Sequence, residues 1–314
     1  MERRRLGSSD LEVSIAGLGC NNFGWFIDRP QSFTVLNDAF EAGINFFDTA
    51  NNYGMPAGES ERILGEAFQN RRDKIIIATK VGDQVDQEGR ERGAAPAYVR
   101  KAVEQSLRNL RTDYIDLYQL HYPDPQTPIE DTLRVFQDLI DEGKIRYIGC
   151  ANHDVAQLSR ALAAAEAIGC AGFVSCQSEY SLIARHVEAD LVPFIQEKAI
   201  GFLPYFPLAN GLLTGKYRNP DSSSGRLEVI KQIPFFEKFL TEERFAKVER
   251  LANISEEEGI PMVDLALGWL ASQPHVSSVI AGATKPSQVK SNVEACNRKL
   301  PEAIMARLDD VTRD

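Results

Sequence analysis

The sequence lacks the features that mark several other classes of protein. No apolar run reaches the roughly 18 residues that suggest a membrane-spanning helix. The basic residues at the N-terminus are followed by no apolar segment, so we expect no secretory signal peptide. The formal net charge of -10 argues against binding to nucleic acid, although an acidic protein can still hold a local basic pocket. We therefore expect neither nucleic acid nor a membrane as a partner.

Cysteine and histidine are also scarce. The five cysteines form no C-x-x-C pair, and their odd number and apolar surroundings suit reduced thiols in the cytoplasm. The four histidines form no H-x-H pair, so the ligand set for a metal-dependent barrel hydrolase is poor. We therefore expect a cytoplasmic protein without a bound metal.

Short apolar runs alternate with helical patterns through most of the chain. A hydrophobic fraction of 43% and a charged fraction of 25% are typical of a globular protein. Eight runs have the length and composition of buried strands. They cover residues 15–19, 44–48, 75–79, 115–120, 147–150, 173–176, 200–205 and 276–281. Helical patterns cover residues 31–42, 60–69, 96–110, 128–142, 154–168, 187–198, 241–258, 262–272, 286–295 and 301–311.

This alternation predicts an α/β fold with a parallel sheet, and eight such units can close into a (β/α)₈ TIM barrel. A doubly wound open sheet is the alternative fold. We also predict a short N-terminal hairpin over residues 5–13 and extra helices before and after the last strand. No linker divides the chain, so residues 1–314 are interpreted as one domain. The Gly-, Pro- and Ser-rich stretch from residue 206 to about 239 is long enough to be functional or disordered.

Four polar residues stand at or just beyond the ends of strand-like runs. They are Asp48, Tyr53, Lys80 and His121. The carboxyl ends of the strands of a parallel barrel meet at one mouth, where the active sites of such barrels lie. A lysine ammonium would lower the pKa of a nearby phenol, and a carboxylate would hold that ammonium in place. This set predicts a proton donor for carbonyl reduction, with Tyr53 as the general acid.

Each of these residues also has a simpler explanation. Tyr53 could be a packing residue, Lys80 a solvated strand end, Asp48 a turn cap and His121 a hydrogen-bonded core residue. It is their joint occurrence at strand ends that favours the catalytic interpretation.

The sequence around these residues resembles the aldo-keto reductases over almost the whole chain. Residues 43–54 read GINFFDTANNYG and match the family pattern G-x-x-x-x-D-T-A-x-x-Y-G. Residues 61–65 supply its Glu-x-x-(hydrophobic)-Gly segment, and residues 79–80 supply its Thr-Lys pair. Residues 113–121, DYIDLYQLH, end in the family's histidine. The resemblance implies an NAD(P)H-dependent oxidoreductase that reduces aldehydes or ketones to alcohols or runs the reverse reaction, with all four catalytic positions filled.

The resemblance implies a nicotinamide cofactor, usually NADPH and possibly NADH, bound in extended form across the barrel mouth. This fits the absence of a G-x-G-x-x-G fingerprint. In the family a Ser-Asn pair and a Gln hold the nicotinamide, and an aromatic residue stacks on its ring. The serine is Ala151 here, and the other three positions correspond to Asn152, Gln177 and Tyr205.

Two further segments resemble the family's phosphate-binding loops. Residues 208–216, with Leu208, Gly211 and Lys216, match the loop that folds over the pyrophosphate. Residues 282–292 match the adenosine-phosphate segment, where a helix start can bind an anion. The resemblance implies roles for Gly282, Thr284, Lys285, Gln288 and Asn292, with Thr284 and Lys285 at a 2′-phosphate and Gln288 and Asn292 at adenine.

The substrate site is implied by the same resemblance. The candidate lining residues are aromatic, which suits an apolar or aromatic carbonyl compound. They are Trp25, Phe26, Tyr122 and Phe206. Little sequence follows the last predicted helix, which predicts an open and permissive pocket.

A regulatory subunit that senses the nicotinamide cofactor with little turnover is an alternative of a different class. The β subunits of potassium channels resemble the same family and form ring tetramers, but they lack the catalytic histidine. His121 is present here, which favours the enzyme. The sequence leaves the natural substrate and the oligomeric state open.

Overall fold

The computed structural model describes residues 1–314 except 87–88, 90, 218–227, 229–230, 234–239 and 314. The chain begins with an antiparallel hairpin of β1 (Arg3–Arg5) and β2 (Glu12–Ser14), in which Arg4 pairs with Val13. The predicted N-terminal hairpin is confirmed, with its strands slightly outside the expected range. Much of the predicted long stretch from residue 206 to about 239 lies outside the described residues.

Eight parallel strands follow, in the order β10-β3-β4-β5-β6-β7-β8-β9. The sheet closes between β9 and the segment before β10, where Phe202 bridges Val276 and the Ser277 N–H donates to the Phe202 carbonyl at 2.9 Å. The predicted (β/α)₈ barrel is therefore confirmed, and the doubly wound alternative is wrong. The strands are β3 (Ala16–Gly19), β4 (Phe46–Asp48), β5 (Ile76–Val81), β6 (Ile115–Leu120), β7 (Ile145–Ala151), β8 (Ser175–Glu179), β9 (Gly201–Tyr205) and β10 (Val279–Gly282).

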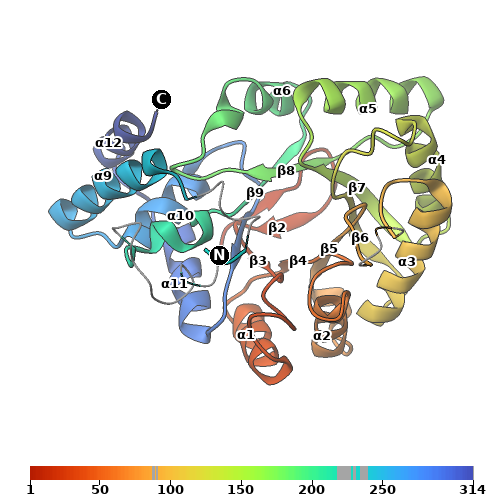
Figure 1. The fold of residues 1–314 in the computed structure, drawn as a ribbon, viewed down its shortest axis with the longest axis horizontal. Helices are drawn as coiled ribbons and strands as arrows, with labels where there is room; N and C mark the ends of the chain where they lie inside the picture. The colour runs from red at the N-terminus through yellow and green to blue at the C-terminus, as the bar shows by residue number, and fades with distance from the viewer. Residues whose placement is uncertain (87–88, 90, 218–227, 229–230, 234–239, 314) are drawn as a thin grey trace.

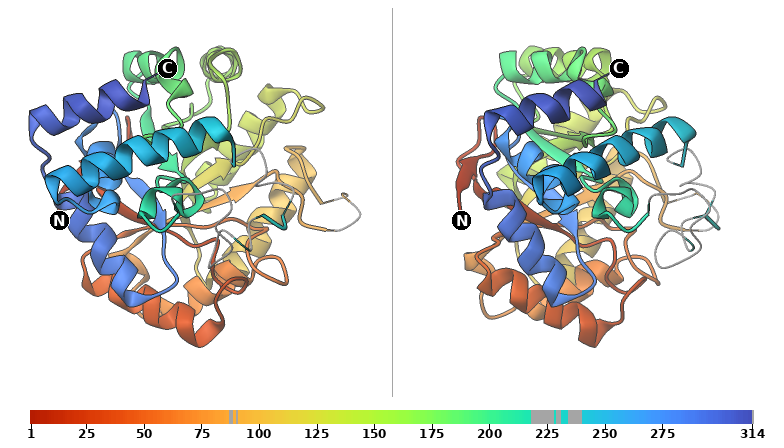
Figure 2. Two further views of the ribbon diagram at one scale, coloured as in Figure 1. Left: turned by 60° about the vertical axis from the view of Figure 1, so that its left-hand side comes forward. Right: turned by 90° about the vertical axis from the view of Figure 1, so that its left-hand side faces the viewer.

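Helices surround these strands (Figure 1). They are α1 (Arg29–Glu41), α2 (Glu59–Ala67), α3 (Pro96–Leu110), α4 (Ile129–Asp141), α5 (Val155–Ile168), α6 (Leu191–Glu197), α9 (Glu242–Glu258), α10 (Met262–Ser272), α11 (Pro286–Asn297) and α12 (Glu302–Thr312). Short 3-10 helices are η1 (Arg72–Lys74), η2 (His186–Glu188) and η3 (Ala209–Thr214). The extra helices predicted before and after the last strand are present, and α9 and α12 lie side by side (Figure 2).

Two predicted elements differ from the structure. The helix expected over residues 187–198 is split into η2 and α6, because Asp190 caps α6 and Pro193, which has no N–H, fits only in its first turn. The strand expected over residues 276–281 begins at Val279, because Val276 makes only an isolated bridge to Phe202 of β9 and the ladder with β3 starts at Val279.

Two apolar clusters form the core of the barrel. The larger cluster packs the strands against the helices. The smaller cluster fills the barrel interior and joins Leu6, Leu11 and Val13 of the hairpin region to Phe46 and Leu117 of the strands. The hairpin region therefore covers the amino-terminal end of the barrel.

The described residues add two observations on the chain as a whole. No described helix combines the length and the apolar character that a membrane crossing requires. All five cysteines are free thiols, and four of them are buried, whereas Cys170 is partly exposed.

Candidate active site

The strand ends bring the four predicted residues to one mouth. Asp48 is the last residue of β4, Lys80 lies in β5 and His121 follows β6 directly. Asp48 pairs with Ala78 across the β4–β5 ladder, and Lys80 pairs with Gln119 across the β5–β6 ladder. Because all these strands are parallel, their polar ends converge on the same side of the barrel.

A buried ion pair forms the floor of this mouth. The Lys80 ammonium is completely buried and donates to Asp48 Oδ1 at 2.5 Å and to the Thr49 carbonyl at 2.9 Å. The other oxygen, Asp48 Oδ2, accepts from Gln119 Nε2 at 3.1 Å and from Gln177 Nε2 at 3.0 Å. A buried charge pair is stable only when its remaining hydrogen-bonding capacity is used, and here both carboxylate oxygens are occupied.

Tyr53 lies above this pair. Lys80 Nζ is 5.0 Å from the centroid of the Tyr53 ring, and the His121 ring meets the Tyr53 ring edge-on at 5.9 Å. Burial raises the pKa of Tyr53 well above its ordinary value, and the carboxylates of Asp48 and Asp83 add to the rise. The expectation that Lys80 lowers this pKa is therefore wrong for the protein alone. Loss of water around the phenol outweighs the attraction of an ammonium that is already paired.

His121 is a buried, neutral imidazole. Burial lowers its pKa well below the usual value, and the positive charge of Lys80 lowers it further. Its backbone is held on both sides, because its N–H donates to the Val81 carbonyl at 2.8 Å and its carbonyl accepts from Asn152 Nδ2 at 2.9 Å. The Nδ1 atom is buried and has no hydrogen-bond partner among the described residues. A buried polar atom without a partner indicates bonding capacity left for another molecule.

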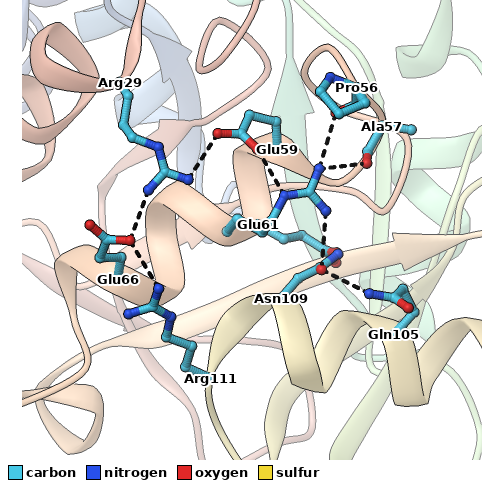
Figure 3. Close-up of polar contacts among 10 residues, drawn as sticks. Arg29, Pro56, Ala57, Glu59, Glu61, Glu66, Gln105, Asn109 and Arg111 are labelled. Atoms are coloured by element: carbon cyan, nitrogen blue, oxygen red, sulfur yellow. Dashed lines mark hydrogen bonds and ion pairs between the residues drawn. The ribbon is translucent and has the colours of Figure 1, made fainter.

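The loop that carries Tyr53 is pinned by an arginine on α2 (Figure 3). Arg62 Nη2 donates to the Ala57 carbonyl at 3.0 Å, while Arg62 Nε donates to Glu59 at 2.8 Å. Arg29 holds Glu59 from the other side at 2.9 Å. The Tyr53 carbonyl itself accepts from the Ser60 N–H at 3.2 Å. These contacts fix the backbone on which Tyr53 stands.

A second carboxylate supports the strand that carries Lys80. Glu61 is completely buried and accepts from the Thr79 hydroxyl at 2.7 Å and from Asn109 Nδ2 at 2.9 Å. Burial raises the pKa of Glu61, and these donors partly oppose the rise. The family motif residues 61–65 thus connect α2 and α3 to the residue next to Lys80.

The three residues predicted to hold the nicotinamide lie on neighbouring strand ends but differ in their bonding. Asn152 Oδ1 accepts from the Tyr205 hydroxyl at 2.8 Å, and Asn152 adopts a left-handed backbone with φ of 60°. Gln177 instead donates to Asp48 and, at 3.2 Å, to Gln119 Oε1. Asn152 and Tyr205 therefore form one unit, and Gln177 belongs to the floor of the site.

The loop predicted to cover a pyrophosphate has an unusual backbone. After Leu208, three consecutive residues adopt positive φ: Ala209 at 45°, Asn210 at 58° and Gly211 at 104°. Asn210 is buried, yet neither of its side-chain amide atoms has a partner among the described residues. Lys216 at the end of the loop is exposed. The Asn210 amide thus has hydrogen-bonding capacity that no described residue uses.

The adenosine-phosphate segment begins at Gly282, the last residue of β10. Lys285 is exposed and immediately precedes α11, whose positive dipole end favours an anion. Gln288 Oε1 accepts from the Thr284 N–H at 2.7 Å and from its hydroxyl at 3.1 Å. Gln288 therefore bonds Thr284 ahead of the helix, and Asn292 is buried one turn further on; their contact with adenine stays a prediction.

The aromatic residues predicted to line the substrate site each pack against another ring. Tyr122 stacks on His121 with ring centroids 4.9 Å apart, and Tyr205 meets Phe206 edge-on at 5.0 Å. Trp25 packs on Phe26 at 4.2 Å and is 45% exposed. Exposed aromatic surface suits contact with an apolar ligand.

Two hollows of about 350 and 230 Å³ are lined by none of the predicted site residues. The larger of the two lies at the hairpin end, where Asp10 and Asp73 line it. Within the described chain, no group of three or more histidine, cysteine or acidic side chains is arranged to hold a metal ion.

Two residues at the site were not predicted from the sequence. Gln119 holds Asp48, and Asp83 follows β5 close to Tyr53. Gln119 could have been found, because it is a polar residue inside an apolar strand and shares a strand face with His121 two positions later. Asp83 lies in a polar loop and carries no such signal.

Comparisons with known proteins agree with this geometry. The model of the aldo/keto reductase family matches residues 16–313. The uncharacterized oxidoreductase YqkF of Bacillus subtilis is 37% identical over 100% of this chain and 97% of its own length. A probable voltage-gated potassium channel subunit beta of Arabidopsis thaliana is 35% identical over 94% of this chain and 91% of its own. The structure of the aldo-keto reductase AKR11C1 from Bacillus halodurans, in its holo form, superposes with a TM-score of 0.83 at 32% identity, covering 100% of this chain and 97% of the other. Asp48, Tyr53, Lys80 and His121 meet at the barrel mouth of a chain that the family model and its relatives match over nearly its whole length. This protein therefore belongs to the aldo/keto reductase family of nicotinamide-dependent oxidoreductases.

Proposed function

We propose that the protein is an NADPH-dependent reductase of aldehydes or ketones that can also run alcohol oxidation, with Tyr53 as the proton donor. The observation that carries this proposal is the buried Asp48–Lys80 pair directly beneath a phenol and beside a neutral imidazole. Burying two charges costs free energy, and a purely structural role would not need them at this place.

The cofactor supplies the hydride when it is bound. Tyr53 then gives its hydroxyl proton to the substrate oxygen, which becomes a strong base as the carbonyl is reduced. A phenol is already protonated at neutral pH, so Tyr53 carries the proton that it would donate. Lys80 stabilises the phenolate left behind, and Asp48 holds Lys80 in position. His121, being neutral, can donate one hydrogen bond to the same oxygen and orient the carbonyl.

The residues at the ends of β7 to β10, on the opposite side of the mouth, are suited to bind the cofactor. Asn152 and Tyr205 would meet the nicotinamide with an amide and a ring, and Gln177 could accept from it through Oε1 while its Nε2 still donates to Asp48. The unused amide of Asn210 and the left-handed turn around it suit phosphate oxygens. Thr284 and Lys285 at the start of α11 suit a 2′-phosphate, which favours NADPH over NADH.

A cofactor-sensing regulatory subunit is the second candidate, because a relative 35% identical over 94% of this chain is called a probable potassium channel subunit beta. His121 beside Tyr53 argues for turnover instead.

The test is a titration of the protein with NADPH and with NADH, followed by protein fluorescence, and then addition of a panel of aldehydes with absorbance readout of the reduced cofactor. Tight NADPH binding with consumption on at least one aldehyde is the expected result. Tight binding without turnover of any carbonyl or alcohol would favour the sensing role.

A further inference from the structure

A carboxylate that the proposed chemistry does not use stands beside Tyr53. Asp83 lies two residues beyond β5, and its Oδ2 accepts a hydrogen bond of 2.8 Å from Nδ2 of Asn52, the neighbour of Tyr53. The turn leading to it passes close to β6, because a Cβ added to Gly82 would lie 3.2 Å from Leu120 Cδ1 and 3.8 Å from the His121 nitrogen. Asp83 is therefore anchored between the loop of Tyr53 and the strand end of His121.

This carboxylate is on the side of the mouth that faces the substrate. The proposed cofactor residues come from the ends of β7 to β10, and β5 stands across the barrel from β9. Asp83, on the β5 loop, is partly exposed, as are Tyr53 and Tyr122. A substrate that places its carbonyl at Tyr53 must extend past these groups.

Among the described residues, no lysine or arginine forms an ion pair with Asp83. The carboxylate accepts from the Asn52 amide and from the Gln84 N–H at 2.7 Å. Lys80 is occupied by Asp48, and Lys101 pairs with Glu91 of the same loop.

The effect of this charge reaches three phenols around the mouth. Burial is the main cause of the raised pKa of Tyr53, Tyr98 and Tyr122, to about 12 in the last two, and Asp83 is a further cause in each. The carboxylate thus acts at the place where a substrate would be bound, among aromatic rings that also attract cations.

We propose that Asp83 makes the reductase select its substrates by charge, so that carbonyl compounds bearing an amine or another cation are preferred and those bearing a phosphate or carboxylate are rejected. This inference rests on the proposed function of the same site. A single charge within several ångströms of the substrate in a partly solvated site changes the rate by about tenfold for each unit of substrate charge.

The experiment compares three benzaldehydes that differ only in the para substituent: carboxylate, hydroxymethyl and trimethylammonio. kcat/KM is measured with NADPH for the wild type, for Asp83→Asn and for Asp73→Asn. Asp83→Asn keeps a side-chain oxygen for the Asn52 amide. Asp73→Asn removes the same charge from η1, at the opposite end of β5. Differences in intrinsic reactivity cancel, because each aldehyde is compared with itself across the variants.

We expect Asp83→Asn to raise kcat/KM for the carboxylate and to lower it for the trimethylammonio compound, each by about tenfold. Both changes should be smaller in about 0.5 M salt, because salt at that concentration screens charges strongly. Asp73→Asn should leave the order of the three substrates as in the wild type. If Asp83→Asn changes all three aldehydes by the same factor, charge selection is overturned while the reductase function stands. If the wild type reduces none of them, nor any other carbonyl, the proposed function fails and this inference fails with it.

Discussion

The two sides of the barrel mouth differ in how completely the protein satisfies its own polar groups. On the side of β4 to β6, the Asp48 carboxylate accepts from Lys80, Gln119 and Gln177, and its neighbour Glu61 is held by two donors. On the side of β9, Asn210 is buried with both amide atoms unpartnered among the described residues. The charged groups of the first side are paired within the protein. Asn210 on the second side, like His121 Nδ1 at the end of β6, has no partner among the described residues and keeps bonding capacity for a ligand.

This difference indicates which groups the fold holds in position before any ligand binds. Groups that handle a proton gain from being held rigidly before the substrate arrives, since their orientation then costs nothing during the reaction. Groups that hold a large ligand gain from being unpaired before it binds. If they were already paired inside the protein, the ligand would have to replace those bonds, which costs binding free energy. The following predictions test this contrast in order of decreasing effect.

Tyr53→Phe removes the proposed proton donor and should lower kcat by about 10²- to 10⁴-fold, the usual contribution of a general acid. Cofactor affinity should stay within about twofold, since no bond to the second side is changed. Rapid-mixing absorbance gives the rate, and a fluorescence titration gives the affinity. Tyr147→Phe is the control, because that hydroxyl bonds Asp10 at the hairpin end. Turnover by Tyr53→Phe equal to that of the wild type would exclude the assignment.

Asp48→Asn leaves the completely buried Lys80 ammonium without its charge partner and should lower the free energy of unfolding by about 3 kcal/mol or more. The same substitution in an exposed pair, Asp138→Asn beside Arg100, should cost at most about 1 kcal/mol. Urea unfolding measures both. Adding Lys80→Met to Asp48→Asn should recover part of the loss, and equal losses for Asp48→Asn and Asp138→Asn would contradict a preformed floor.

Lys285→Ala tests the second side. It should weaken NADPH binding by about tenfold and NADH binding little, because the lost interaction is with one phosphate. Fluorescence titrations with both cofactors measure the ratio. Lys290→Ala, an exposed lysine of the same helix that faces Glu294, is the matched control. A similar loss for both cofactors would remove the 2′-phosphate role from Lys285.

The smallest effect concerns acid stability. The pKa of His121 is lowered in the folded protein, so below about pH 6.5 the unfolded chain takes up a proton that the folded one does not. Stability is therefore lost as the pH falls through that range, by at most about 1.4 kcal/mol per pH unit from this group. The stability difference between the wild type and His121→Gln should thus shrink from pH 7.5 to pH 5. Unfolding curves at both pH values decide, and a constant difference would mean that the pKa of His121 is the same in the folded and the unfolded state.

Much of this contrast could not have been read from the chain. The distinction between a satisfied Asp48 and an unpaired Asn210 depends on where Gln119 and Gln177 point, and no local pattern states that. The nicotinamide role of Gln177 stays a prediction, but nothing in the sequence indicates that its amide nitrogen also bonds Asp48. That bond forms because β8 and β6 bring their glutamines to the same carboxylate inside the closed barrel. The expected fall in the pKa of Tyr53 was wrong for a related reason: the sequence suggested the nearby ammonium, but the loss of solvent depends on packing from all sides.

The sequence by itself determined the order of the elements and the chemical types at the strand ends. Apolar runs of strand length and capped helices are local features, and so are the motif residues Asp48, Tyr53, Lys80 and His121. Only the tertiary structure decided which of these groups are paired, which are left open and that Asp83 stands beside Tyr53. Distances between loops, and with them desolvation and charge, arise when parallel strands close into a barrel and residues far apart in the chain come to share one mouth.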